Sequence, residues 1–117
     1  MFDRPQGGDA VVLVCLDFGT EGYEDSLAEL KLLAASAGLS ARAVIGGKRQ
    51  RPDPALFAGS GKVGEIAEAL RAQQASLVVF NHELSPAQER NLEKALDCRV
   101  IDRTSLILDI FDDPIEN

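Results

Sequence analysis

The chain has 117 residues, of which 45% are hydrophobic and 26% are charged, and its net charge at pH 7 is −7. These proportions are typical of a globular protein of one domain; they exclude a mainly disordered chain, and the apolar runs are too short to span a membrane. The acidic balance argues against a whole-surface nucleic-acid binder, so we expect no DNA partner, but it allows a local basic patch.

The chain begins with a predicted strand and helix. Residues 10–16 are a near-continuous β-rich apolar run, which is typical of a strand buried on both faces. A loop over residues 19–24 follows. Asp25 can cap a helix that runs to about Ala37, where Gly38 is a natural stop.

A second strand and a long connection come next. The strand is predicted over residues 41–45 and ends at a pair of glycines. The connection, residues 47–58, is long for a compact α/β domain, where about 2–6 residues are usual. Its last residues, 56–58, are a candidate short strand, and a helix then begins at residues 59–61 with Ser60 as its cap.

The next strand is predicted over residues 77–80, and the clearest local signal follows it. Ser85, a proline and Gln88 have the spacing of a capping box with proline in the first turn. The helix that they begin is predicted to run to about Leu96.

The chain closes with a short strand and a last helix. The strand is predicted over residues 99–101, and Thr104 can cap a helix over residues 105–111. Residues 112–117 form an acidic tail. The alternation of strands and helices predicts an α/β fold, with a four-stranded, mainly parallel sheet and helices on both faces.

The cysteines and the histidine bear on compartment and metal binding. Cys15 and Cys98 are too few for a disulfide framework or a zinc site, so we expect buried free thiols. With His82 as the only histidine, we expect no metal centre. No secretory leader begins the chain, and these features together predict a cytoplasmic protein.

A glycine-rich segment is a candidate phosphate site. Residues 59–62, Gly-Ser-Gly-Lys, resemble a phosphate loop, but Leu56 stands at its first glycine and Val63 replaces the hydroxyl that would hold Mg²⁺. One interpretation is a helix start with tight packing. The other is that the helix N-terminus and Lys62 hold a phosphate of RNA or of a nucleotide.

Four basic residues gather within fifteen positions of this acidic chain: Lys48, Arg49, Arg51 and Lys62. A solvated loop is one explanation. The alternative is a surface that contacts RNA phosphates, favoured by prolines that stiffen the loop and so reduce the entropy lost on binding.

Asp17, Asn81 and Asp102 each follow a predicted strand and can therefore share the crevice at one end of the sheet. Together with Gly59, Ser60, Gly61 and Lys62 they are candidate nucleotide-binding residues. A structural role is the alternative, in which Asp102 caps a helix or pairs with Arg103. The residues that a phosphoacceptor domain or a hydrolase would need are missing.

The last helix is too apolar for a free surface helix. We expect part of it to cover the sheet and the rest to meet a partner, either a second copy in a homodimer or a following domain. The candidate residues are Leu106, Ile107, Ile110 and Phe111.

Several segments resemble the N-terminal domain of the HflX family of ribosome-associated GTPases. They are residues 1–4, 51–54, 59–69, 81–93, 100–104 and 106–111, so the resemblance covers about residues 1–111. It implies a four-stranded parallel α/β domain that contributes rRNA contacts on the large ribosomal subunit and restrains a following GTPase domain.

The resemblance also implies that full-length members bind GTP and Mg²⁺ and split stalled ribosomes, and an ATP-related activity is ascribed to this region. The chain itself contains no GTPase motif, so we expect no catalytic residue and no cofactor in it. Residues 112–117 depart from the family pattern. A fragment, a truncated frame and a stand-alone relative all remain open, as does a second function class, a weak nucleotide-binding or NTPase domain.

Overall fold

In the part of the chain that the structure describes, four parallel strands form one sheet in the order β2-β1-β3-β4. The computed structural model describes residues 9–19, 21–51 and 53–111. The strands are β1 (Asp9–Val14), β2 (Leu39–Ile45), β3 (Leu77–Phe80) and β4 (Arg99–Asp102). The helices are α1 (Tyr23–Ser36), α2 (Ser60–Gln73), α3 (Pro86–Leu96) and α4 (Arg103–Phe111).

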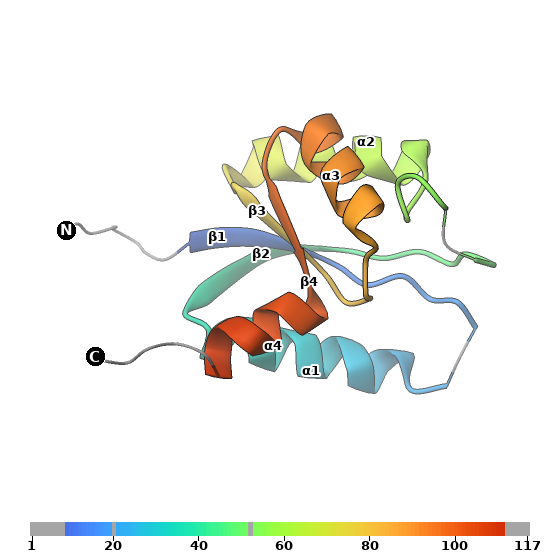
Figure 1. The fold of residues 1–117 in the computed structure, drawn as a ribbon. Helices are drawn as coiled ribbons and strands as arrows, with labels where there is room; N and C mark the ends of the chain where they lie inside the picture. Colours follow the sequence, from blue (N-terminus) through green and yellow to red (C-terminus); the bar gives the residue numbers. More distant parts are fainter. Residues whose placement is uncertain (1–8, 20, 52, 112–117) are drawn as a thin grey trace.

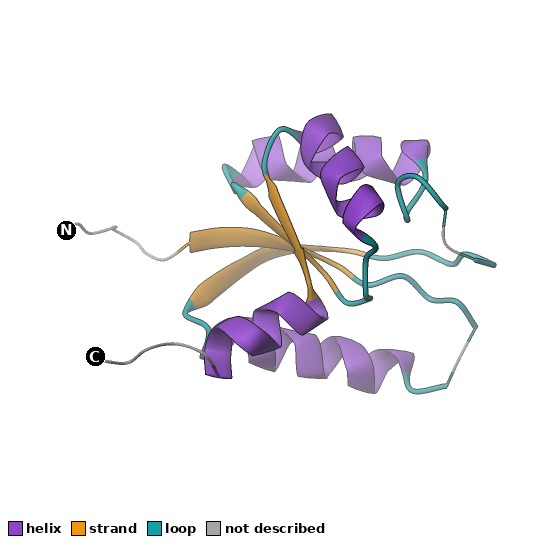
Figure 2. Cartoon of the chain, viewed as in Figure 1, coloured by secondary structure: helices purple, strands orange, loops and turns teal. Residues whose placement is uncertain are grey.

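Helices cover both faces of the sheet, as the alternation of elements predicts. Figures 1 and 2 show α2 and α3 on one face and α1 and α4 on the other. The strand residues of β1 alternate between the two layers. Val12 and Val14 pack with the α2/α3 layer, and Val11 and Leu13 pack with the α1/α4 layer. All four are fully buried, which explains the continuous apolar run of this strand.

The order of strands decides where a site can lie. The chain leaves β1 toward α1 on one face and leaves β3 toward α3 on the other. The carboxyl ends of these neighbouring strands therefore border the crevice in which open α/β sheets commonly bind ligands. The loops that follow β1, β2 and β3 meet at this end of the molecule.

The four main strands and the four helices that were predicted are present, but several local details were wrong. Helix α1 begins two residues before Asp25, after Gly22 in the left-handed conformation, so Asp25 lies in the first turn rather than at the cap. Gly59, not Ser60, is the N-cap of α2. Residues 56–58 form no strand; Phe57 makes only an isolated antiparallel bridge to Asp53.

The start of α4 is also capped differently from the prediction. Asp102, not Thr104, is the cap, since its carboxylate accepts a hydrogen bond from the Ser105 amide at 2.9 Å. The other carboxylate oxygen accepts from the Leu84 amide at 3.0 Å. Asp102 therefore has the structural role that the sequence left open, and it ties the loop after β3 to the start of α4.

The capping box at α3 is confirmed. The Ser85 hydroxyl accepts from the Gln88 amide at 3.1 Å, and the Gln88 side chain accepts from the Ser85 amide at 3.0 Å. We expect Ser85→Ala to lower the free energy of unfolding by about 1 kcal/mol, and Ser85→Thr to lower it by less, because threonine keeps the acceptor. Urea denaturation measures both. An alanine variant as stable as the wild type would contradict this role.

The two cysteines differ in burial. Cys15 is buried and Cys98 is half-buried, and both thiols are free. Burial raises the pKa of the Cys15 thiol, and burial together with the charges of Glu93 and Asp97 raises that of Cys98 to about 11. Both thiols are therefore protonated at neutral pH, which makes them poor nucleophiles. Within the described residues, no helix has the length and apolar character needed to cross a membrane.

Candidate functional site

The loops after β1 and β2 run side by side beyond the sheet. Parallel pairing continues past the strand ends, because the Asp17 amide donates to the Gly47 carbonyl at 2.8 Å and the Arg49 amide donates to the Asp17 carbonyl at 2.9 Å. Figure 1 shows these two segments, in blue and green, extending from the sheet. We call residues 15–19 and 46–50 the tip ribbon. It holds its side chains in a defined register, unlike a free loop.

The rest of the long connection is fastened to α3. Gln88 donates to the Asp53 carbonyl at 2.8 Å, and Asn91 donates to the Ala55 carbonyl at 3.0 Å. The Asp53 carboxylate accepts from the amides of Leu56 and Ala55, and these two hydrogen bonds lower its pKa. The polar residues of α3 thus shape a loop more than thirty positions earlier in the chain.

Phe57 anchors the same connection in the core. Its side chain is 5% exposed, although its backbone has φ of 60°, in the left-handed region that bulky residues rarely adopt. Its ring packs edge-on against Phe80, with centroids 5.9 Å apart, and lies 5.1 Å from the His82 ring. Packing therefore holds Phe57 in a conformation that its own backbone disfavours.

His82 joins the tip ribbon to the loop after β3. Its Nε2 accepts a hydrogen bond from the Leu16 amide at 2.9 Å, so this nitrogen carries no proton. Burial lowers the pKa of the imidazole below its ordinary value. No local sequence pattern indicates this role, because the partner lies 66 positions away.

This arrangement predicts acid sensitivity. Since folded His82 binds a proton less readily than the unfolded chain does, its contribution to stability is complete above about pH 6.5 and is lost as pH falls toward the folded pKa. We expect the His82→Gln variant to lack this pH-dependent part of the free energy of unfolding, which amounts to at most about 1.4 kcal/mol per pH unit. Thermal unfolding of both proteins between pH 7.5 and 5.5 measures it; parallel pH dependences would refute the assignment.

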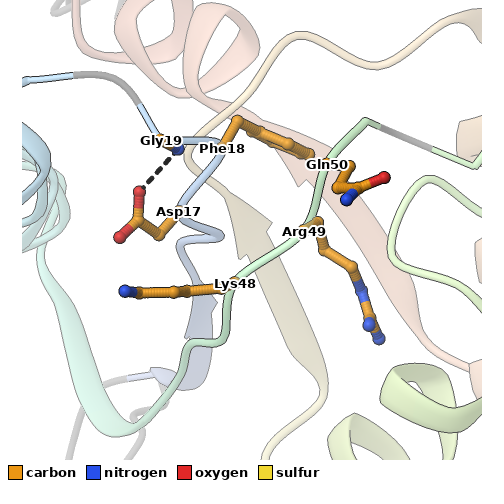
Figure 3. Close-up of a pocket in the computed structure, with 6 residues that line it drawn as sticks. All are labelled: Asp17, Phe18, Gly19, Lys48, Arg49 and Gln50. Atoms are coloured by element: carbon orange, nitrogen blue, oxygen red, sulfur yellow. Dashed lines mark hydrogen bonds between the residues drawn. The ribbon is translucent and has the colours of Figure 1, made fainter.

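Three of the four predicted cations are exposed on the tip ribbon and its continuation: Lys48, Arg49 and Arg51. Lys48 and Arg49 line a groove of ≈ 500 Å³ together with Asp17, Phe18, Gly19 and Gln50 (Figure 3). Arg49 and Arg51 line a neighbouring hollow of ≈ 380 Å³ that includes residues 59–61. A Cβ added at Gly59 would stand 3.9 Å from the Arg49 guanidinium. Arg49 therefore belongs to both hollows.

Lys62 is held apart from these cations. Its ammonium donates to the Gly46 carbonyl at 2.7 Å and forms an ion pair with Glu65 at 2.9 Å. It passes over Gly47, where an added Cβ would stand 2.8 Å from the Lys62 nitrogen. The glycine pair after β2 thus makes room for a lysine that stabilises the end of the strand.

The three strand-end polar residues do not converge on one ligand position. The Asp17 carboxylate accepts from the Gly19 amide at 2.9 Å, and both oxygens of Asp102 accept from backbone amides. Asn81 is buried and donates to Ser26 at 2.7 Å and to the Cys15 sulfur at 3.1 Å. Each side chain is therefore used within the fold.

A polar network that sequence reasoning missed fills the crevice beside β1 and β3. Arg103 donates to the Asn81 oxygen at 3.1 Å and to Ser26 at 3.2 Å, and it forms an ion pair with Glu29. The Tyr23 hydroxyl donates to the Cys15 carbonyl at 2.9 Å. The remaining hollow has only ≈ 230 Å³, below the range of about 300–1,000 Å³ usual for small-molecule sites.

The last helix divides between core and surface, but Leu106 does not lie where it was predicted. Leu106 is buried in the α1/α4 layer, so its assignment to a partner surface was wrong. Ile107 is half-buried and Leu108 is 53% exposed. The side chains of Ile110 and Phe111 lie outside the described residues, as does the tail over 112–117.

Comparison with known proteins begins with a family match. Residues 24–112 match the family described as GTP-binding GTPase N-terminal. The match covers more than half of the chain and includes α2, α3, α4 and all of α1 except its first residue.

The curated relatives agree with that match. The GTPase HflX of Escherichia coli is 54% identical over 111 residues, which cover 95% of this chain and 26% of that protein. The GTPase HflX of Lacrimispora saccharolytica is 43% identical over 104 residues, covering 88% of this chain and 25% of that protein. The chain thus spans about a quarter of the length of these relatives.

Solved structures share the fold. The SsGBP–GDP complex matches with a TM-score of 0.69 and 18% identity, covering 94% of this chain and 31% of that one. A GTP-binding protein of Sulfolobus solfataricus in complex with GDP matches with a TM-score of 0.63 and 18% identity, covering 89% and 30%. At this identity, the likeness establishes the α/β architecture alone.

Proposed function

The chain belongs to the HflX family, of which it is the N-terminal domain, and from this premise we propose that residues 1–111 bind rRNA of the large ribosomal subunit and regulate a GTPase domain. Lys48, Arg49 and Arg51 are the phosphate-binding residues in this proposal. Lys62 has a supporting place, because its contact with the Gly46 carbonyl fixes the end of β2 beside the tip ribbon.

One observation carries the proposal: exposed cations are held on a fastened loop of a chain whose net charge is −7. Phosphate contacts provide much of the affinity for nucleic acid, whereas acidic surfaces elsewhere are repelled. A loop fixed by Gln88, Asn91 and Phe57 loses little conformational entropy when it binds. The fold therefore favours one basic contact region over a diffuse one.

Salt dependence tests the proposal. We expect the chain to co-sediment with purified large subunits, and its affinity to fall with log[salt] by a slope of about 0.7–0.9 for each phosphate neutralised. The measurement is a binding series between 50 and 200 mM salt. Absence of binding at the lowest salt, or an affinity independent of salt, would refute an electrostatic rRNA contact.

The proposal extends to the longer relatives. In a full-length protein, a GTPase domain would bind GTP and Mg²⁺ and drive ribosome splitting, and the domain described above would position and restrain it in the cytoplasm. Supporting this division, the relatives are called GTPases and are about four times as long as the chain. Adding the isolated domain to a full-length relative should then lower its ribosome-stimulated GTP hydrolysis by competition for the subunit.

Nucleotide binding by this chain alone is the alternative, at residues 59–62 with Asp17, Asn81 and Asp102. The internal use of these side chains and the small crevice volume favour it less. Calorimetry with ATP and GTP, with and without Mg²⁺, distinguishes the two. A flat trace at millimolar nucleotide removes the alternative; heat of binding would reinstate it.

A homodimer through α4 stays a prediction, supported by the exposure of Leu108. Light scattering measures it directly. A monomer would mean one of two things: another domain covers the helix in the full-length protein, or the apolar residues of α4 are buried enough within this domain.

A further inference from the structure

We propose that the groove of the tip ribbon holds one unstacked base of single-stranded RNA, stacked on Phe18, while Arg49 holds the adjoining phosphate. The inference rests on the proposed function and deepens it. It adds an aromatic subsite to an RNA contact that the proposed function assigns to cationic side chains alone. Phe18 also borders the small hollow of the strand-end crevice, and the hollow beside Arg49 reaches the glycine-rich helix start.

The first support is the composition of the groove. Its side chains combine an aromatic ring, two cations, an amide and one carboxylate: Phe18, Lys48, Arg49, Gln50 and Asp17. Its volume of ≈ 500 Å³ lies within the range of about 300–1,000 Å³ that small organic ligands occupy. An aromatic ring beside cations is the usual means by which proteins hold unpaired bases.

The second support is the way the side chains divide. Residues 17 and 48 are bridge partners in the ribbon, and Figure 3 shows Asp17 and Lys48 pointing to one side while Phe18 and Gln50 lie together on another. The carboxylate of Asp17 accepts from the Gly19 amide and points away from the phenyl ring. On the Phe18 side, Gln50 offers a donor and an acceptor for the edge of a base.

The third support is the packing of Phe18 itself. Its ring is perpendicular to the rings of Phe57 and His82, with centroid distances of 5.8 and 5.2 Å. These edge-type contacts fix its orientation, and the side chain is only half-buried, so it also borders the groove. None of its aromatic contacts among the described residues is a parallel stack. A flat base can stack on the Phe18 ring. Because the ring is already fixed by its neighbours, it loses no further mobility when the base binds.

Arg49 connects the base to the backbone of the RNA. It lines both the groove and the neighbouring hollow that also contains Arg51. A nucleotide with its base on Phe18 would thus place its phosphate beside the guanidinium groups of Arg49 and Arg51. Each guanidinium can donate two parallel hydrogen bonds to the oxygens of one phosphate. Lys48, on the other side of the ribbon, is left for a second phosphate.

The test is made with the whole chain and a short RNA. The probe is a hexanucleotide with 2-aminopurine at one central position. The matched control is the same RNA with an abasic site at that position. We expect the base to improve affinity by about 5- to 150-fold, as base–aromatic stacking does elsewhere, and to quench 2-aminopurine fluorescence. Equal affinity for the two RNAs, or binding of neither, overturns the inference without any variant.

Two variants then locate the base. Phe18→Leu should lose the preference for the RNA with the base, whereas Phe18→Tyr, which keeps a ring, should retain it; thermal unfolding checks that both are folded. A Phe18→Leu variant that still prefers the base refutes the assignment to this ring. Large-subunit binding that is salt-dependent but insensitive to Phe18→Leu would leave the proposed function standing while the base subsite falls.

Discussion

Replacing Lys48, Arg49 and Arg51 together with alanine is expected to weaken binding to large ribosomal subunits by roughly 100-fold. The estimate takes about 1 kcal/mol for each exposed charge-assisted contact. The variant should also show a shallower salt dependence, with the slope reduced by roughly 2–3 if each side chain neutralises one phosphate. The folded state should change little, because all three side chains are exposed. Co-sedimentation at several salt concentrations measures both quantities.

A charge-matched control separates this patch from net charge. The triple variant of Arg42, Arg71 and Lys94 to alanine removes the same charge from β2 and from the last turns of α2 and α3. The two helix ends lie at the opposite end of the sheet from the tip ribbon. We expect near wild-type binding from it. If both triple variants bind equally well, or lose affinity equally, the assignment of the contact to the tip ribbon is wrong.

Phe57→Ala is expected to cost about 3–5 kcal/mol in free energy of unfolding, the usual range for removing a buried aromatic side chain. That is a large share of the roughly 5–15 kcal/mol that stabilises a typical domain. The variant also removes the ring that contacts Phe80 and His82. The connection that carries Arg49 and Arg51 then loses its anchor in the core. Affinity for large subunits should therefore fall as well, even under conditions in which the variant remains folded. Urea denaturation gives the stability, and binding at low temperature gives the affinity.

Phe57→Leu is the matched variant, because leucine keeps an apolar anchor. Its cost should be clearly smaller, roughly 1–1.5 kcal/mol, and its subunit binding close to normal. A loss below about 1 kcal/mol for the alanine variant would mean that the connection is held chiefly by Gln88 and Asn91. The two contributions can then be separated by a Gln88→Ala, Asn91→Ala double variant.

Features set by neighbouring residues could be predicted from the sequence. The apolar run of β1, the box formed by Ser85 and Gln88, and the alternation of strands and helices all depend on spacings within one element. Helix starts were less predictable where several residues could cap. At α4, Asp102 and Thr104 are both good caps, and only the position of the Leu84 amide beside the Asp102 carboxylate decides between them.

The site depends on contacts that no local pattern contains. The bond from the Leu16 amide to His82 and that from Lys62 to the Gly46 carbonyl join residues 66 and 16 positions apart. A phenylalanine at φ of 60° is disfavoured by its own backbone, so Phe57 could not be placed by propensity. The cations of the tip ribbon could be proposed as a group, but Lys62 separates from them only once the chain is folded.

The strand order has a consequence for the newly made chain. Of the four described strands β1 is made first, yet it lies inside the sheet and needs β3, which ends at Phe80, to cover its second edge. At about 5–20 residues per second, its apolar sequence waits several seconds for that partner. Hairpins could form sooner, but every pairing in this parallel sheet needs a helical crossover. During synthesis, the segment that later forms the most protected strand is thus the one most in need of chaperone cover.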